Sequence, residues 1–173
     1  ANELQIKCHD IYEPNCNTFF TYDILIIDLN EVEKLKELPF QKKVVVVSVE
    51  ELRPTIRHHF YERYPGYDLI HGRGQKSYRW ALRYVRYTLD IPILKIQYGN
   101  HLDQYGELMG VSPGLTFPIV VMIHGGFWKY SYERDLNYRM INYLIKQGIV
   151  VWNIEYRRIV KSHYSFGSIE EDI

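Results

Sequence analysis

The sequence lacks long apolar runs, a signal peptide and metal-binding cysteine patterns. No run approaches the ~20 apolar residues of a membrane-spanning helix, and the first residues show no basic stretch followed by an apolar one. The only cysteines, Cys8 and Cys16, have no zinc-type spacing to histidines. Two cysteines without a secretory signal favour reduced thiols. We therefore expect a cytoplasmic protein with no membrane partner, no metal and no cofactor.

An excess of charge of either sign is also absent. Lys+Arg and Asp+Glu both total 21, so the formal net charge is zero. A neutral chain gives no bulk electrostatic case for binding nucleic acid or an anionic membrane, and we expect no nucleic-acid partner. With 46% hydrophobic and 24% charged residues among 173, the composition is that of a globular chain with one domain or two very small ones.

Strand and helix patterns alternate through the first half of the chain. Four short apolar stretches are typical of buried strands: residues 22–29, 42–49, 67–74 and 91–99. Three helical patterns separate them: residues 30–40, 50–66 and 75–89. In the second helix His58 and His59, beside Arg57 and Arg63, are expected on a solvated or half-buried basic face. The alternation predicts a largely parallel sheet covered by helices.

The pattern changes after Gly99. Residues 103–111 resemble a strand that pairs as a hairpin with its neighbours, and residues 117–125 and 149–158 read as buried strands around a helix at 131–148. The expected fold class is α/β, with a mostly parallel sheet, helices on both faces and a β-hairpin near residues 93–111. The break in the pattern divides the chain into a small βαβ-type region, residues 1–92, and a second region, residues 93–173.

The stretch His124-Gly125-Gly126-Phe127-Trp128 stands between a strand and a helix. Glycines there let the backbone pass close to a ligand, and N–H groups before the first helical turn are free to face an anion. That is the geometry of an oxyanion hole, which stabilises the charge that develops in acyl transfer. The alternative is a tight strand-to-helix turn with two packed aromatic residues.

The second region resembles an α/β-hydrolase of the kynurenine formamidase (arylformamidase) and carboxylesterase type. The resemblance is carried by "IQYGNHLDQYGEL", "FPIVVMIHGGFW", "GIVVWNIEYRR" and "GSIEED", in that order, and covers residues ~95–173. In that family the His-Gly-Gly loop follows the third strand and supplies oxyanion-hole amides. The resemblance implies an incomplete α/β-hydrolase-like half that acts on small aryl amides or esters.

The same resemblance implies a role for each residue of the loop. The oxyanion hole would be formed by the backbone of Gly125, Gly126 and Phe127. His124 would support the loop, and Trp128 would pack at the edge of the pocket. Glu155 and Arg157, at the end of the fourth strand, would be polar residues that support the site.

The family's nucleophile is missing from this sequence. It sits on a Gly-x-Ser-x-Gly elbow, and no such motif occurs here. Ser168 and Glu171 form a capping box that is expected to start a helix at Ser168, and Glu171 stands two residues before the last residue, Ile173. We expect an elbow about thirty residues further on in a complete enzyme. Without nucleophile and base, these residues are expected to be hydrolase-like but inactive.

The alternative is a non-catalytic binding module in which a partner chain covers an exposed sheet edge.

A second glycine turn, His71-Gly72-Arg73-Gly74, follows the third strand stretch. It could face a phosphate, but Ser77 replaces the last glycine of a dinucleotide-binding motif and no Gly-Lys-Ser/Thr follows. Residues 67–92 faintly resemble the N-terminal domain of a GT-B glycosyltransferase, which implies a nucleotide-sugar binder. The plainer interpretation is a strand-to-helix turn within an α/β layer.

Overall fold

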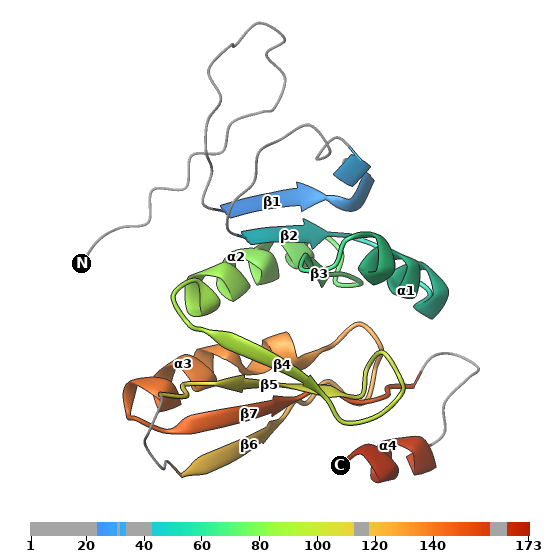
Figure 1. The fold of residues 1–173 in the computed structure, drawn as a ribbon. Helices are drawn as coiled ribbons and strands as arrows, with labels where there is room; N and C mark the ends of the chain where they lie inside the picture. Colours follow the sequence, from blue (N-terminus) through green and yellow to red (C-terminus); the bar gives the residue numbers. More distant parts are fainter. Residues whose placement is uncertain (1–23, 31, 34–42, 113–117, 160–165) are drawn as a thin grey trace, which may run out of the picture.

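The computed structural model describes residues 24–30, 32–33, 43–112, 118–159 and 166–173 (Figure 1). Within them the chain forms two β-sheets with helices packed against them, so the α/β class is confirmed. Cys8, Cys16 and most of the helix expected over residues 30–40 lie outside the described residues. No helix of the described part of the chain is long and apolar enough to cross a membrane.

Sheet A is parallel and has three strands in the order β1(Ile24–Asp28), β2(Lys43–Val47) and β3(Asp68–Ile70). Its helices are α1(Pro54–Arg63) and α2(Lys76–Thr88). Successive side chains of a strand point to opposite faces. Val44 and Val46 therefore pack with Phe60 of α1, whereas Val45 and Val47 pack with α2. Both faces of this sheet are covered by a helix, as predicted.

Sheet B contains β4(Ile93–Gln97), β5(Tyr105–Met109), β6(Ile119–Ile123) and β7(Val150–Ile154), in the order β4-β5-β7-β6. Strands β4 and β5 form the expected hairpin, with Ile93 opposite Met109. Strand β5 is also antiparallel to β7, while β6 and β7 are parallel. The 3-10 helix η2(Arg134–Asn137) and α3(Tyr138–Lys146) connect these last two strands.

The prediction of one largely parallel sheet is wrong. Residues 91–99 were expected to continue the parallel sheet of the first half, but β4 belongs to sheet B and pairs antiparallel with β5. The cause is the short turn after β4, where the Tyr98 N–H donates to the Gln104 carbonyl at 2.9 Å. So short a connection can only return the chain antiparallel, because a parallel pair needs a long crossover.

One hydrophobic core lies between the two sheets. It contains Val45 and Val47 of sheet A, Ala81 of α2, and Met109 and Val151 of sheet B. Helices α2 and α3 meet within it, where the rings of Tyr84 and Tyr138 lie 4.9 Å apart, edge to face. The proposed division near residue 92 follows the passage from one sheet to the other, but the core is shared by both regions.

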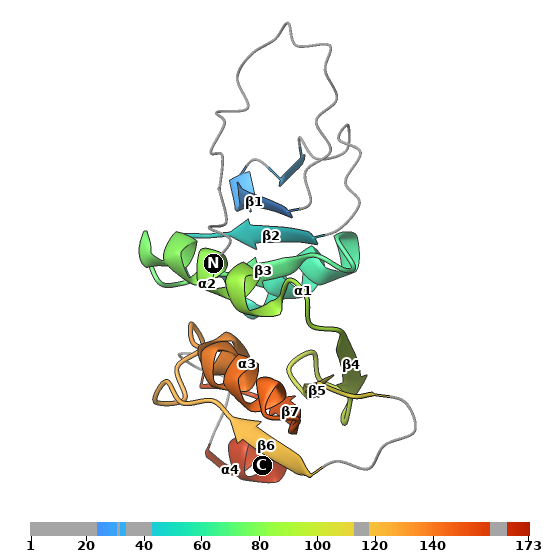
Figure 2. The ribbon, with the colours of Figure 1, turned by 90° about the vertical axis from the view of Figure 1, so that its left-hand side faces the viewer.

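The other face of sheet B is apolar and exposed. One row of side chains crosses all four strands: Leu94, Leu108, Trp152 and Val121. Val121 is 53% exposed and Ile119, on the edge strand β6, is 61% exposed. Figure 2 shows α3 on the side of β6 that faces sheet A and the final helix, α4(Phe166–Asp172), on the opposite side. This helix begins at Phe166, so Ser168 lies inside it and the predicted start at a Ser168 capping box is wrong.

Candidate functional site

The loop after β6 has an unusual backbone. Gly126 has a φ of 116°, and the next two residues, Phe127 and Trp128, have φ values of 58° and 56°. Left-handed backbone is costly for a residue with a Cβ, of order 1–3 kcal/mol each. Two consecutive aromatic residues in this region are therefore held by their surroundings. Such strain is concentrated at functional sites.

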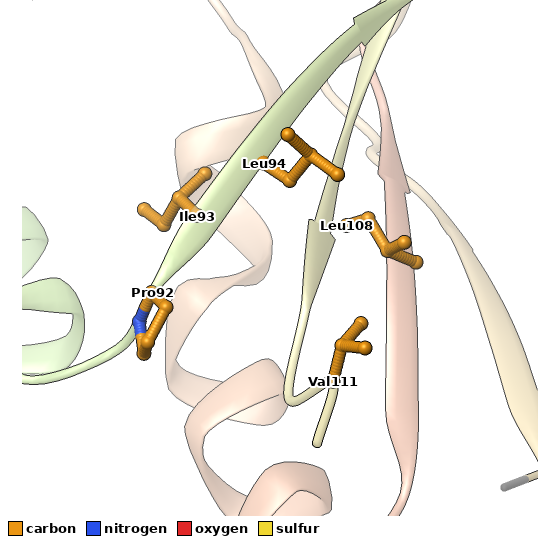
Figure 3. A pocket seen from close by; sticks show the side chains of 5 residues that line it. All are labelled: Pro92, Ile93, Leu94, Leu108 and Val111. Carbon is orange, nitrogen blue, oxygen red and sulfur yellow. The ribbon is translucent and has the colours of Figure 1, made fainter. Parts of the chain in front are cut away.

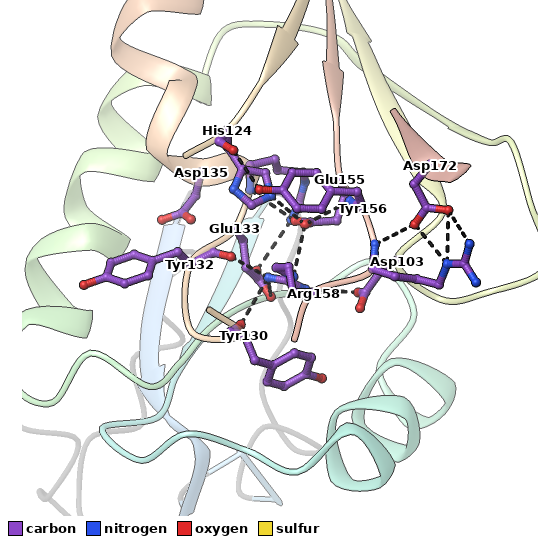
Figure 4. Close-up of polar contacts among 12 residues, drawn as sticks. Asp103, His124, Tyr130, Tyr132, Glu133, Asp135, Glu155, Tyr156, Arg158 and Asp172 are labelled. Atoms are coloured by element: carbon purple, nitrogen blue, oxygen red, sulfur yellow. Dashed lines mark hydrogen bonds and ion pairs between the residues drawn. The ribbon is translucent and has the colours of Figure 1, made fainter. Parts of the chain in front are cut away.

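His124, the first residue of the loop, is buried and held on three sides. Its Nε2 lies 2.9 Å from Oε1 of Glu155, and its Nδ1 lies 2.8 Å from the carbonyl oxygen of Gly125. The ring stacks on Tyr156 at 4.3 Å, and the Tyr156 hydroxyl donates to the His124 carbonyl (Figure 4). Both ring nitrogens face oxygen acceptors, so neither is free to act as a base toward a substrate. His124 supports the loop.

Glu155 follows β7 and is fully buried. Its Oε1 faces His124, and its Oε2 accepts the backbone N–H of Arg134 at 3.1 Å. Burial by itself raises the pKa of this carboxyl. The nearby Arg158 and His124 outweigh burial and lower the pKa from 4.5 to about 2. Glu155 is therefore a buried anion that joins the end of β7 to the residues on either side of the loop.

The two glycines of the loop have different surroundings. A Cβ on Gly126 would lie 2.4 Å from the Cβ of Tyr132, whereas a Cβ on Gly125 would meet no atom within 4 Å. The Gly126 carbonyl accepts the Lys129 N–H, and the Trp128 carbonyl accepts the Ile159 N–H at 2.9 Å. Within the described residues, the N–H groups of Gly126 and Phe127 donate no hydrogen bond. They are available to a negatively charged oxygen.

The aromatic residues of the loop lie at the surface. Phe127 is 81% exposed, and its ring lies 5.7 Å from that of the partly exposed Trp128. An apolar pocket lies away from the loop, at the other end of sheet B (Figure 3). It measures about 180 Å³ and is lined by Pro92, Ile93, Leu94, Leu108 and Val111. The loop thus presents donors and aromatic rings on an open surface.

Arg157 and Arg158 diverge after Tyr156. Arg157 turns to α4, where Nη2 lies 2.8 Å from Oδ1 of Asp172 and its backbone N–H donates to the same carboxylate. Arg158 is buried, and its Nη1 donates to the carbonyls of Tyr130 and Tyr132 at 3.2 and 2.7 Å. Of these two neighbours, Arg158 is the one that contacts the loop segment, and the sequence did not single it out.

Arg158 also belongs to a closed ring of four buried charges. The ring runs from Arg57 of α1 to Asp103, then to Arg158 at 3.2 Å, to Glu133 at 3.3 Å and back to Arg57 at 3.1 Å. Figure 4 shows three of its members, Asp103, Arg158 and Glu133. Burial opposes ionisation of Glu133, but the two guanidinium groups hold its pKa well below the ordinary value. Arg57, expected on a solvated or half-buried face, is 1% exposed. No sequence pattern predicted this ring of charges.

The described residues contain no serine–histidine pair. No serine hydroxyl among them is hydrogen-bonded to a histidine, and the buried His71 accepts the Leu52 N–H at Nδ1 while its Nε2 faces Glu133. No group of three or more His, Cys, Asp or Glu side chains in this part of the chain is placed to hold a metal ion.

Comparison with known proteins gave no match to any family model, curated protein or solved structure.

Proposed function

We propose that residues 93–173 form the oxyanion-loop half of a hydrolase of the arylformamidase or carboxylesterase type. The observation that carries the proposal is the loop itself: the buried His124–Glu155 pair holds it, and the Gly126 and Phe127 amides have no acceptor among the residues that the structure describes. The loop also lies between the third strand of sheet B and the next helix, the position of oxyanion loops in α/β-hydrolases.

The proposed chemistry is stabilisation of a tetrahedral oxyanion formed at an amide or ester carbonyl. Preorganised N–H groups are worth roughly 3 kcal/mol each in such a transition state. The exposed rings of Phe127 and Trp128 favour an aryl group on the substrate. Attack on the carbonyl needs an activated nucleophile, and no Gly-x-Ser-x-Gly elbow occurs in the 173 residues. We therefore propose that this chain alone does not turn over an ester.

Binding of an oxyanion by the loop can be tested without catalysis. We expect benzoate, titrated into the ¹⁵N-labelled chain, to shift the amide protons of Gly126 and Phe127 along one saturable curve. Gly126→Ala should abolish the shift, because the new Cβ would lie 2.4 Å from Tyr132. Gly125→Ala, which has space for its Cβ, is the matched control and should keep it. Absence of any shift at Gly126 and Phe127 would argue against an oxyanion loop.

A second measurement addresses turnover. The 173-residue chain and a Gly126→Pro variant, which lacks the donor N–H, are compared with p-nitrophenyl acetate as substrate. We expect equal rates. A rate well above that of the variant would mean that the chain carries a nucleophile that neither its sequence nor its structure reveals.

The exposed face of sheet B favours a second candidate, an interaction module. Ile119, Val121 and Ile123 of the edge strand β6 are all exposed, and parallel strands are normally covered on both faces. In this proposal a second copy of the chain covers that edge and face. Light scattering should then show a concentration-dependent dimer, and Val121→Lys should make it monomeric. A wild-type chain that stays monomeric at 100 µM, a concentration of the order at which weak dimers form, would contradict it.

A further inference from the structure

The turn His71-Gly72-Arg73-Gly74 packs directly on the segment that follows the His-Gly-Gly loop. A Cβ on Gly72 would lie 2.7 Å from the Cβ of Ser131, so the two backbones approach as closely as a glycine allows. The turn is held on its other side by the connection between β2 and α1, where the N–H groups of Gly72 and Gly74 donate to the carbonyls of Glu50 and Val49. A rigid part of the first region therefore lies against residues 131–135.

Within this turn, the side chain of Arg73 makes the polar contacts with residues 131–135. Its Nε donates to the Ser131 carbonyl at 2.8 Å, and its Nη2 donates to Oδ1 of Asp135 at 2.6 Å. The side chains of Arg73 and Asp135 are each 5% exposed, so the pair is shielded from solvent. The guanidinium also lies over the ring of Tyr132, 5.5 Å from its centre. These contacts occupy the guanidinium within the protein and leave it unsuited to bind a phosphate.

The segment that Arg73 holds is the one that supports Gly126. Three successive carbonyls each accept from an arginine: Tyr130 and Tyr132 from Arg158, and Ser131 from Arg73. The Cβ of Tyr132 then lies against Gly126, close enough to exclude any side chain there. The Tyr132 N–H closes the turn by donating to the Lys129 carbonyl at 3.1 Å.

We propose that Arg73 is a positioning residue for the His-Gly-Gly loop. Through Ser131, Asp135 and Tyr132 it fixes the backbone on which Gly126 rests, so that the first region of the chain serves the loop of the second. The inference depends on the proposed function in one respect only, namely that the loop binds an oxyanion. The arrangement itself is a property of the fold, and its test requires no hydrolysis.

Hydrogen exchange of the full 173-residue chain tests the proposal. The reporters are the amides of Lys129, Tyr132 and Ile159, which close the loop through hydrogen bonds. In Arg73→Ala these amides should exchange at least tenfold faster than in the wild type, which for exchange from open states corresponds to a loss of about 1.4 kcal/mol. Arg73→Lys, which keeps the charge but not the paired donors, should give an intermediate rate.

Two controls separate positioning from general destabilisation. Arg79→Ala, at an exposed arginine of α2, should leave the three amides at their wild-type rates. The amides of β7 should exchange within twofold of their wild-type rates in every variant.

Asp135→Asn, which removes the partner charge with little change of shape, should also accelerate exchange of the loop amides several-fold. Unchanged loop amides in Arg73→Ala, or equal acceleration of loop and β7, would overturn the proposal. If the exchange pattern is as expected but benzoate does not bind, the result contradicts the proposed function and leaves the role of Arg73 intact.

Discussion

The imidazole of His124 and the carboxylate of Glu155 lie 2.9 Å apart in the interior, and each also forms a hydrogen bond with the backbone. This pair joins the first residue of the glycine loop to the end of β7. Because Glu155 is fully buried, its charge is stabilised only by the groups that surround it. The loop therefore depends on a contact between residues 31 positions apart in the chain.

Loss of the Glu155 charge should destabilise the protein in a pH-dependent way. The pKa of Glu155 is lowered from 4.5 to about 2, so its contribution is present above pH 4.5 and is lost as the pH falls toward 2. We expect Glu155→Gln to lower the free energy of unfolding by roughly 3 kcal/mol at pH 7. The difference from the wild type should shrink below pH 4.5. Urea denaturation followed by circular dichroism measures the free energy of unfolding of both proteins at each pH. A difference between them that does not depend on pH would refute the role of the Glu155 charge.

The two glycines of the loop should tolerate alanine very differently. Gly126→Ala places a Cβ 2.4 Å from Tyr132 and an alanine at a φ of 116°, so we expect a loss of roughly 1–3 kcal/mol of unfolding free energy. Gly125→Ala should change it by less than about 0.5 kcal/mol, because its Cβ meets no atom. Thermal denaturation of the two variants compares them directly. Equal losses would mean that Gly126 is not confined.

Neighbouring arginines should have separable roles. Arg158→Met breaks the buried ring of charges and should cost roughly 3–5 kcal/mol of unfolding free energy. Arg157→Ala should cost about 1 kcal/mol or less, since that side chain is partly exposed and contacts only α4. It should instead release α4, so that a Glu-specific protease cleaves after Glu171 faster. Urea denaturation and proteolysis give the two readouts, and the reverse order of stability losses would contradict the geometry.

Lys95 should carry an unusually reactive amine. Lys95 is an exposed residue of β4. Its Nζ lies 3.8 Å from the centre of the Tyr105 ring, and the desolvation of the amine there, together with the nearby charge of Arg134, lowers its pKa from 10.5 to about 8. The unfolded chain then binds more protons between pH 8 and 10.5, so this group makes stability rise with pH across that window. With limiting acetic anhydride at pH 7.5, mass spectrometry should show Lys95 acetylated several-fold faster than the exposed Lys76. Similar rates would show an ordinary amine.

Local sequence patterns were sufficient for most of the described strands and helices. The valines of β2 form a continuous apolar run because both faces of that strand are covered by helices. The hairpin near residues 93–111 followed from two strand patterns with a short connection. The glycine loop was recognised because two glycines stand between a strand and a helix, where they let the backbone pass close to a ligand.

The assignment of strands to sheets was beyond the sequence. An apolar run indicates that a strand is buried but not which strand lies beside it, and β4 was therefore placed in the wrong sheet. The site residues show the same limit. Arg157 and Arg158 are adjacent in one motif, yet successive residues of an extended chain point to opposite sides, and only Arg158 contacts the loop segment.

The sequence by itself determined the α/β class, most strands and helices, and the glycine loop, because each depends on the periodicity and conformational freedom of neighbouring residues. Only the tertiary structure decided which charges meet. Arg57 and Asp103 are 46 residues apart, and Arg73 and Asp135 are 62 apart. A buried charge is stable only with a partner, and that partner is chosen by how α1, η2 and the strand ends pack together. The support of the His-Gly-Gly loop is therefore a property of the folded chain.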